Sequence, residues 1–299
     1  MRAAVIGIGS NSLRMLVADI ESAKLYRLIR DREGLRVFAA LDENGNIRQS
    51  MMAQACQSVN AMLEKARTNH AEQFHVFATS AVRDAKNQQA FCALLEKETG
   101  IRPEICSGQE EAELSFIGAT EQQRSGLIDI GGGSTEVVVG QGSRIDFAHS
   151  FQLGAVRLHG DCPIRTVEDG CAVAAQAAAQ LLQYRQAILQ QAAIPCWIGV
   201  GGTFTALAAL AQQLDWLDRE KIHGFVASRD IVCRTLDLVS PLSVDERLKL
   251  RGIQPNRADI IAHGFAILLA CMDTLDIPEI IVSEYGNLEG YLKRKYCGR

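Results

Sequence analysis

The sequence predicts an α/β fold built from two similar halves, and three observations lead to this prediction. Strand and helix patterns alternate along the 299 residues. The stretches VIGIGSNSLRMLVADI (5–20) and LIDIGGGSTEVVVG (127–140) share one design, in which two apolar runs flank a turn of small residues. No proline-rich or charged linker separates the halves. We therefore expect one domain over residues 1–122 and a second over residues 123–299.

In the first half, apolar alternation on both sides of Gly-Ser-Asn-Ser predicts a hairpin of strands 3–8 and 13–20. A third strand is expected over 25–29, followed by a turn at DENGNI and a helix over 51–68. The stretch FHVFATSAVRDAKNQQAFCALLEKETG then predicts a buried strand, a break at Thr-Ser and another helix. We expect Gly100 to end that helix in the left-handed conformation.

The next helix start is marked by a capping box. Ser107 and Glu110 have the spacing at which a serine hydroxyl and a glutamate carboxylate satisfy each other's backbone amides. This spacing places Glu111 in the first turn of the helix that follows.

The second half repeats the hairpin around GGGS, beginning with a strand from Gly126 to Asp129. The alanine-rich stretch EDGCAVAAQAAAQLLQYRQAILQ predicts a long helix, and CWIGVGGTFTALAALAQQL predicts a strand, a glycine loop and a helix. Further helices are expected to the end. A cleft between two similar halves, each contributing a glycine turn, is the simplest arrangement.

Composition limits the classes of partner. The formal net charge of −4 gives no overall attraction to nucleic acid or acidic membranes. No apolar run approaches the roughly 20 residues that span a bilayer, and no signal-peptide pattern precedes the first strand. The nine cysteines are scattered without a Cys-x-x-Cys pair. We expect a cytoplasmic protein with reduced thiols, no membrane association and no nucleic-acid partner.

The glycine turns have the composition of phosphate-binding loops. Residues without a Cβ atom let successive amides converge on an anion, and neighbouring hydroxyls add donors. Either turn alone could be only a tight hairpin connection. A dinucleotide-binding loop is disfavoured because it opens a helix, whereas GGGSTEVVVG returns into a strand. The candidate phosphate-binding residues are Ser10, Asn11, Ser12, Gly131, Gly132, Gly133, Ser134, Thr135, Gly201 and Gly202.

Many motifs occur in the order seen in the exopolyphosphatase and guanosine pentaphosphate phosphatase family (Ppx/GppA), which the chain resembles over nearly its whole length. They are IGSNSLRMLV, FATSAVRDAKN, SGQEEAELSFIGA, LIDIGGGSTEVVVG, QLGAVRL, GVGGTFTALAAL, HGFVAS, NRADIIAHGFAIL and EYGNLEGYL. The resemblance implies two ribonuclease-H-like domains of the actin and sugar-kinase superfamily around an interdomain cleft. It also implies a short, two-domain member and a homodimer.

The resemblance implies a role for several of these residues. Glu111 falls on the family's catalytic glutamate, which takes a proton from the attacking water. Asp129 and Glu136 fall on the acidic pair that serves a divalent cation, for which Mg²⁺ is expected. Arg83 and Arg14 fall on arginines that hold phosphate. From the residues alone, Glu111 could be an exposed first-turn glutamate and either arginine a surface ion-pair partner. Lys86, Arg157 and Arg257 also lie in family-like motifs, and no role is assigned to them.

Two positions depart from the family pattern. Gly7 stands where the family usually has an aspartate, and Leu288 stands where it often has an arginine. Loss of a carboxylate weakens divalent-cation binding but also reduces the repulsion of a polyphosphate. We expect a site that has adapted to this loss. Either Gly7 adopts backbone angles that an L-residue disfavours, or its missing side chain admits a phosphate or another residue's carboxylate.

The resulting functional prediction is a metal-dependent phosphohydrolase. It would release terminal phosphate from inorganic polyphosphate or from guanosine pentaphosphate or tetraphosphate. Two other classes stay open at this point, a non-catalytic sensor of such polyanions and an ATP-dependent phosphotransferase.

Overall fold

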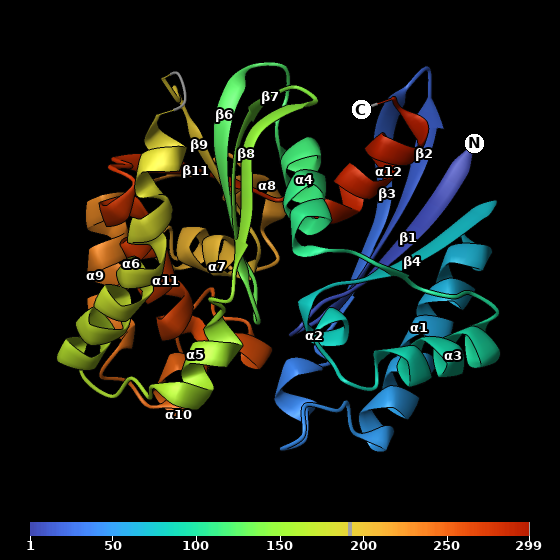
Figure 1. Ribbon diagram of the computed structural model, residues 1–299, viewed down its shortest axis with the longest axis horizontal. Helices are drawn as coiled ribbons and strands as arrows, with labels where there is room; N and C mark the ends of the chain where they lie inside the picture. Colours follow the sequence, from blue (N-terminus) through green and yellow to red (C-terminus); the bar gives the residue numbers. More distant parts are fainter. Residues whose placement is uncertain (191–192, 299) are drawn as a thin grey trace. The chain divides into compact units, whose positions relative to one another are not determined.

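The computed structural model describes residues 1–190 and 193–298, and it divides into two compact units, each built on one mixed sheet (Figure 1). Unit 1 comprises Met1–Gly118 and Asn287–Arg299, and unit 2 comprises Ala119–Gly286. The predicted α/β class is therefore confirmed. The predicted second domain, 123–299, included the last helix, whereas the structure places that helix with the first unit. The reason is tertiary, because its apolar side chains pack on the first sheet.

The sheet of unit 1 has the strand order β3-β2-β1-β4-β5. The first three strands form an antiparallel meander, and β4 and β5 continue the sheet parallel to β1. This arrangement confirms the predicted hairpin and third strand. The strands are β1 (Arg2–Ile8), β2 (Leu13–Glu21), β3 (Lys24–Glu33), β4 (Gln73–Ala78) and β5 (Glu104–Ile105).

Helices cover both faces of this sheet, as the alternation in β1 requires. Ile6 and Ile8 belong to the core under α1 and α3, whereas Ala3 and Val5 belong to the core under α12 (Figure 1). The helical segments of unit 1 are η1 (Phe38–Ala40), α1 (Gln49–Thr68), α2 (Ser80–Arg83), α3 (Gln88–Thr99), α4 (Gly108–Ala119) and α12 (Asn287–Tyr296).

Unit 2 repeats this design with one additional strand. Its sheet has the order β10-β11-β9-β6-β7-β8, in which an antiparallel meander is followed by strands parallel to β6, with β10 antiparallel at the edge. The duplication inferred from the two hairpins is therefore present at the level of topology. The strands are β6 (Arg124–Ile130), β7 (Thr135–Gln141), β8 (Arg144–Phe151), β9 (Trp197–Val200), β10 (Val226–Ser228) and β11 (Glu279–Ser283).

The helices of unit 2 share one large apolar core with its sheet, to which α6, α9 and α11 contribute. The sequence predicted only helices after the glycine loop of GVGGT, and β10 and β11 were missed. Both are short, and an apolar run as short as Ile280–Val282 has no period that distinguishes strand from helix. The helical segments are α5 (Ala155–Asp161), α6 (Val167–Leu189), α7 (Gly202–Ala211), α8 (Arg219–Ile222), α9 (Arg229–Val239), α10 (Val244–Arg247), η2 (Pro255–Arg257) and α11 (Ile261–Thr274).

Several local predictions are confirmed. Gly100 follows α3 with a left-handed φ of 76°. Glu110 Oε2 accepts from the Ser107 amide at 2.8 Å, and the Glu110 amide donates to Ser107 Oγ at 3.1 Å, which is the capping box. All nine cysteines are free thiols. Among the described residues, no helix has the length and apolar character needed to cross a membrane.

Candidate active site

Three loops of unit 1 follow the carboxyl ends of its three mutually parallel strands. They are Gly9–Ser12 after β1, Thr79–Arg83 after β4 and Cys106–Glu111 after β5. In open α/β sheets, ligands bind outside the carboxyl ends of such strands. The predicted site residues of the first half therefore gather at the edge of the sheet where a ligand is expected.

The first glycine turn is tied to the loop after β4. The Gly9 amide donates to the Ser12 carbonyl at 3.1 Å, which closes the turn. Ser10 Oγ lies 2.6 Å from Ser80 Oγ, and both side chains are buried. Ser80 was not among the predicted site residues, although its position in the Thr-Ser break, three residues before Arg83, was a signal for it.

The space at Gly7, two residues before this turn, is filled by apolar side chains. A Cβ atom on Gly7 would lie 2.9 Å from Phe77 Cζ and 3.1 Å from Leu288 Cδ2, and Gly7 does not have a positive φ. Both alternatives expected for Gly7 are therefore wrong, since neither its backbone angles nor a phosphate or carboxylate explains the missing side chain. Arg14, which is opposed to Gly7 on β2, donates from Nη2 to Asn287 Oδ1 at 3.1 Å.

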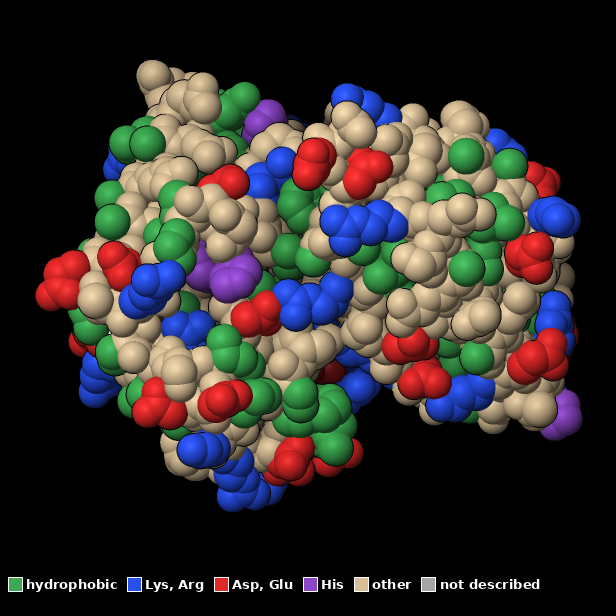
Figure 2. Space-filling model, turned by 90° about the horizontal axis from the view of Figure 1, so that it is seen from below, with side chains coloured by type: hydrophobic (Ala, Val, Ile, Leu, Met, Phe, Trp, Pro, Cys, Tyr) green, Lys and Arg blue, Asp and Glu red, His purple; other side chains and the backbone are tan. Residues whose placement is uncertain are grey.

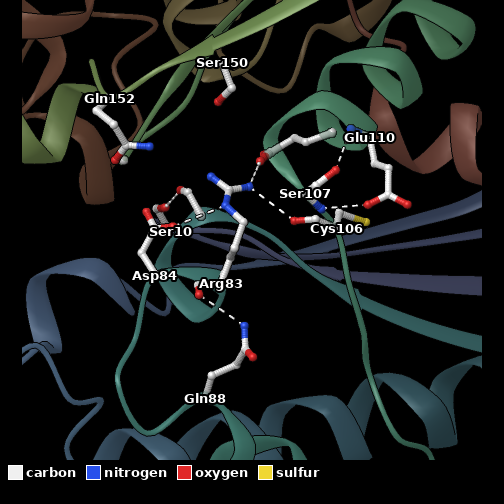
Figure 3. Close-up of polar contacts among 12 residues, drawn as sticks. Ser10, Arg83, Asp84, Gln88, Cys106, Ser107, Glu110, Ser150 and Gln152 are labelled. Atoms are coloured by element: carbon white, nitrogen blue, oxygen red, sulfur yellow. Dashed lines mark hydrogen bonds and ion pairs between the residues drawn. The ribbon is translucent and has the colours of Figure 1, made fainter.

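Glu111 lies in the first turn of α4 and is 8% exposed, so the alternative of a solvent-exposed glutamate is wrong. Its Oε2 accepts from Arg83 Nη1 at 3.1 Å. Arg83 also donates to the Cys106 carbonyl at 3.3 Å and to Asp84 Oδ1 at 3.2 Å (Figure 3). The predicted alternative for Arg83 was a surface ion pair, and the ion pair that it makes is instead with the candidate base Glu111. Through these contacts one guanidinium links the loops that follow β4 and β5.

Glu110 and Cys106, which lie in the same loop as Glu111, have different roles from it. The Ser107 amide and hydroxyl hold the pKa of Glu110 below its usual range, so this carboxylate is used in capping. Burial, with a smaller contribution from the negative charge of Glu111, raises the pKa of the Cys106 thiol to about 12. Cys106 is therefore a neutral side chain at neutral pH, and Glu111 is the carboxylate of this loop that contacts Arg83.

The glycine turn of unit 2 has its carbonyls bound by the start of α5. The amides of Ala155 and Val156 donate to the carbonyls of Gly131 and Gly132 at 3.0 and 2.9 Å, and Arg157 Nε donates to the Gly133 carbonyl at 2.9 Å. Because the N–H and C=O groups of a trans peptide point in opposite directions, the amides of residues 132–134 point away from α5. These amides are therefore not directed at α5, which is one condition for a turn that binds an anion through its amides.

Two residues of this region have structural roles that the sequence did not indicate. Arg157, which had no assigned role, supports the glycine turn from the α5 side. Thr135 was predicted to donate a hydrogen bond to phosphate, and this is wrong in the present structure. Its side chain is fully buried and its hydroxyl donates to the Leu153 carbonyl. Successive residues of a strand face opposite sides, so Thr135 points into the core when Glu136 points out of it.

Asp129 and Glu136 are directly opposed on β6 and β7, and their side chains therefore share one face of the sheet. The next residue in the same row is Ser150 on β8, whose Oγ donates to Glu136 Oε1 at 2.7 Å. On the other side of the row, a Cβ atom on Gly201 would lie 3.0 Å from Asp129 Oδ1. The common side predicted for the two carboxylates is confirmed, and Ser150 is a member of the row that sequence reasoning missed.

This row fits a hard divalent cation. Mg²⁺ is commonly held by one or two carboxylates and completes its octahedral shell with water and phosphate oxygens. In the part of the chain that the structure describes, no cluster of three or more His, Cys, Asp or Glu residues could hold a metal ion. An ion bound here would therefore use Asp129 and Glu136 and take its other oxygens from water or substrate.

The second glycine loop of unit 2 begins α7 and lies against an arginine. Gly201 has a φ of +96°, a conformation that favours glycine. A Cβ atom on Gly202 would lie 1.8 Å from Cζ of Arg257, so the absent side chain makes room for that guanidinium. Arg257 Nε donates to Gln254 Oε1 at 3.3 Å. The arginine without an assigned role thus places a positive charge at the predicted phosphate loop.

Comparisons with known proteins agree with the sequence motifs. A family model described as the Ppx/GppA phosphatase family matches residues 16–296. Exopolyphosphatase 2 of Mycobacterium tuberculosis is 30% identical over 97% of this chain and 97% of its own. A solved Ppx-GppA enzyme of Aquifex aeolicus covers 98% of this chain and 99% of its own, with 26% identity and a TM-score of 0.83. A solved exopolyphosphatase of Cytophaga hutchinsonii covers 100% of this chain and 98% of its own, with 25% identity and a TM-score of 0.89.

Proposed function

Because the chain belongs to the Ppx/GppA phosphatase family, we propose that it hydrolyses the terminal phosphoanhydride bond of inorganic polyphosphate. The observation that supports this most directly is the buried carboxylate of Glu111, held by Arg83 among the loops that follow the parallel strands. A general base must lie within hydrogen-bond reach of the water that it deprotonates, and an arginine beside it can hold the phosphate that the water attacks. The activity in the name of the mycobacterial relative indicates the substrate class.

In the proposed reaction, Glu111 takes a proton from water while the water oxygen forms a bond to the terminal phosphorus. The bond from that phosphorus to the bridging oxygen breaks, and the bridging oxygen leaves with the shortened chain. Arg83 has five N–H donors in a planar fork, so one guanidinium can hold both Glu111 and a phosphate oxygen. Within unit 2, taken by itself, the amides of residues 132–134 are the groups that would donate to phosphate. A divalent cation on Asp129 and Glu136 would neutralise part of the phosphate charge.

Local positive groups carry the attraction for substrate, because the whole molecule is slightly acidic. The net charge is −4, and on the face shown in Figure 2 the positive and negative side chains are interspersed. A polyanion therefore meets no broad basic surface there. In unit 1 the group proposed to bind phosphate is Arg83, and in unit 2 the proposed groups are Arg257 and the amides of the glycine turn.

The test is phosphate release from polyphosphate with Mg²⁺ and no acceptor molecule. Phosphate release from polyphosphate supports the proposal. Phosphate release only from guanosine pentaphosphate would mean that the reaction is the proposed hydrolysis but that the substrate is a guanosine nucleotide. Binding of both compounds without release would identify a polyanion-binding protein. Release that requires an added acceptor would identify a phosphotransferase.

The proposed cation site has its own test in a Mg²⁺ titration of activity. We expect Asp129→Asn and Glu136→Gln to raise the Mg²⁺ concentration needed for half-maximal activity by roughly tenfold or more, because each removes one charge beside the ion. Ser150→Ala should have a smaller effect in the same direction. Glu43→Gln removes an exposed carboxylate elsewhere and is the charge-matched control. An unchanged titration for both carboxylate variants would reject the assignment.

A further inference from the structure

The three carbonyls of the glycine turn in unit 2 are held in two different ways. Those of Gly131 and Gly132 accept from backbone amides at the start of α5, at 3.0 Å for the first and at 2.9 and 3.1 Å for the second. The carbonyl of Gly133 instead accepts from a side chain, Nε of Arg157, at 2.9 Å. Two peptide units of the turn are therefore fixed by helix backbone and the third by a guanidinium.

That third peptide unit joins Gly133 to Ser134, and it needs an external contact to keep its orientation. Because Gly133 has no Cβ atom, backbone sterics restrict the rotation of this peptide less than that of an ordinary one. Its N–H group is the Ser134 amide, and this amide is one of the three proposed to donate to phosphate. A rotation of the peptide would turn the amide away from the anion and bring a carbonyl oxygen towards it.

The guanidinium of Arg157 is itself held in place. Its Nη2 donates to Gln152 Oε1 at 2.7 Å, while its Nε donates to the Gly133 carbonyl. Two N–H groups of one planar fork thus bind two carbonyl oxygens, which restricts rotation of the side chain. The exposed Gln152 is therefore a tether for the arginine and does not reach the turn through a printed contact of its own.

The chain before α5 also lies in direct contact with the turn. A Cβ atom on Gly154 would be 2.3 Å from the carbonyl oxygen of Gly132 and 2.5 Å from the carbonyl carbon of Gly133. The turn therefore has no room to move towards α5. With this close packing behind it, the orientation of the Gly133–Ser134 peptide depends on the hydrogen bond from Arg157.

We propose that Arg157 is a positioning residue of the glycine turn, which orients the Gly133–Ser134 peptide and strengthens the Ser134 amide as a donor to phosphate. The inference rests on the proposed function, since it concerns a group through which unit 2 would bind the same substrate. A cationic donor on the carbonyl polarises the peptide and makes its N–H group more positive, so hydrogen bonds on its two sides reinforce each other. Arg157 thus acts on the anion through the backbone.

The first experiment is an NMR titration of the ¹⁵N-labelled whole protein with tripolyphosphate in EDTA. The amide resonances of Gly132, Gly133 and Ser134 should shift in the wild type, and Arg157→Gln should weaken the affinity by roughly tenfold, a usual effect of losing one charge-assisted hydrogen bond. Arg165→Gln removes an exposed positive charge from the same unit and is the charge-matched control. Turn amides that do not respond in the wild type, or equal affinities of the two variants, would overturn the inference.

A second experiment separates positioning from the charge of Arg157 alone. Arg157→Lys keeps the charge without the planar fork, and Gln152→Leu keeps the arginine but removes its tether. Both should bind tripolyphosphate roughly three- to tenfold more weakly than the wild type. Gln152→Leu/Arg157→Gln should bind no more weakly than Arg157→Gln, because Gln152 acts through Arg157. Wild-type affinity in both single variants, with the fold of each verified by circular dichroism, would contradict positioning.

The outcomes also separate this inference from the proposed function. If the turn amides respond to tripolyphosphate and Arg157→Gln weakens that response, but no phosphate is released from polyphosphate with Mg²⁺, the hydrolytic function fails and the positioning role stands. If polyphosphate is hydrolysed but Arg157→Gln binds tripolyphosphate as tightly as the wild type, the positioning role fails and hydrolysis stands.

Discussion

Glu110 and Glu111 are adjacent residues with separate roles, and the difference can be measured. We expect Glu111→Gln to keep the fold and lower turnover of polyphosphate by about two to four orders of magnitude, the usual contribution of a positioned base. Glu110→Gln is the matched control, because glutamine also serves at this position of a capping box. It should keep turnover and change thermal stability little. Normal turnover in a folded Glu111→Gln variant would show that another group activates the water.

His263 makes the stability of unit 2 depend on pH. Burial lowers its pKa to about 4, and His159 lies beside it with a centroid distance of 5.1 Å. Its Nε2 lies 2.8 Å from the Cys162 carbonyl, which fits a neutral ring that carries its proton on Nε2. A histidine with a pKa near 6.5 in the unfolded chain takes up a proton on unfolding anywhere between these two values.

Protonation of His263 on unfolding therefore lowers the stability of the folded protein at acidic pH. The stability contributed by neutral His263 is fully present above pH 6.5 and is lost as the pH falls towards 4. We expect the melting temperature to fall on acidification from pH 7 to pH 5. The fall should be smaller in His263→Gln, which has no group that titrates in this range. Melting curves of the two proteins at several pH values provide the measurement, and identical pH dependence would contradict the assignment to His263.

At the scale of elements, α12 holds the helix that carries Glu111. Gly290 lies so close to α4 that an added Cβ atom would be 1.8 Å from the Leu114 carbonyl oxygen. Lys293 Nζ donates to the carbonyls of Ile117 and Gly118, at 3.1 and 2.9 Å, near the end of α4. A cation at that end also interacts favourably with the helix dipole. The position of Glu111 therefore depends on a helix from the other end of the sequence.

Gly290→Ala tests this coupling between helices. The new methyl group must push α12 and α4 apart, so we expect a loss of about 1–3 kcal/mol in the free energy of unfolding and a fall in kcat. Gly160→Ala is the matched control, since its Cβ atom would meet no other atom within 4 Å. Urea unfolding and turnover measured on both variants would decide the matter. A Gly290→Ala variant with wild-type stability would mean that the contact can relax without cost.

At the scale of the whole molecule, the features that could be predicted from the sequence are those that depend on a few neighbouring residues. The glycine turns, the capping box and the end of α3 depend on neighbouring residues, and each of these formed as expected. The opposition of Asp129 and Glu136 follows from the length of the turn between them. Contacts between distant segments could not be predicted in this way. The packing of Phe77 and Leu288 against Gly7 and the placing of Arg257 on Gly202 depend on tertiary structure alone.

The order of the chain through the two units has a consequence for their folding as fragments. Unit 2 is a single continuous segment, whereas unit 1 needs both 1–118 and the last helix. Without α12, one face of the first sheet would expose the apolar side chains that it covers. These include Val5, Leu16 and Phe77. A fragment spanning 119–286 contains every residue of the large apolar core of unit 2 and all three strands of its meander.

We therefore expect the fragment 119–286 to fold alone and the fragment 1–118 to aggregate or remain partly unfolded. Joining 287–299 to residue 118 through a flexible Gly/Ser linker should restore cooperative melting, because the linker costs little entropy compared with the apolar area that α12 buries. The same linked polypeptide carrying Leu292→Asp is the control, since a charge in that core should prevent α12 from docking. Circular dichroism and thermal melting of the four polypeptides give the measurement. Cooperative melting of 1–118 alone would show that unit 1 is stable without α12. In that case α12 would not be required to hold α4 in place.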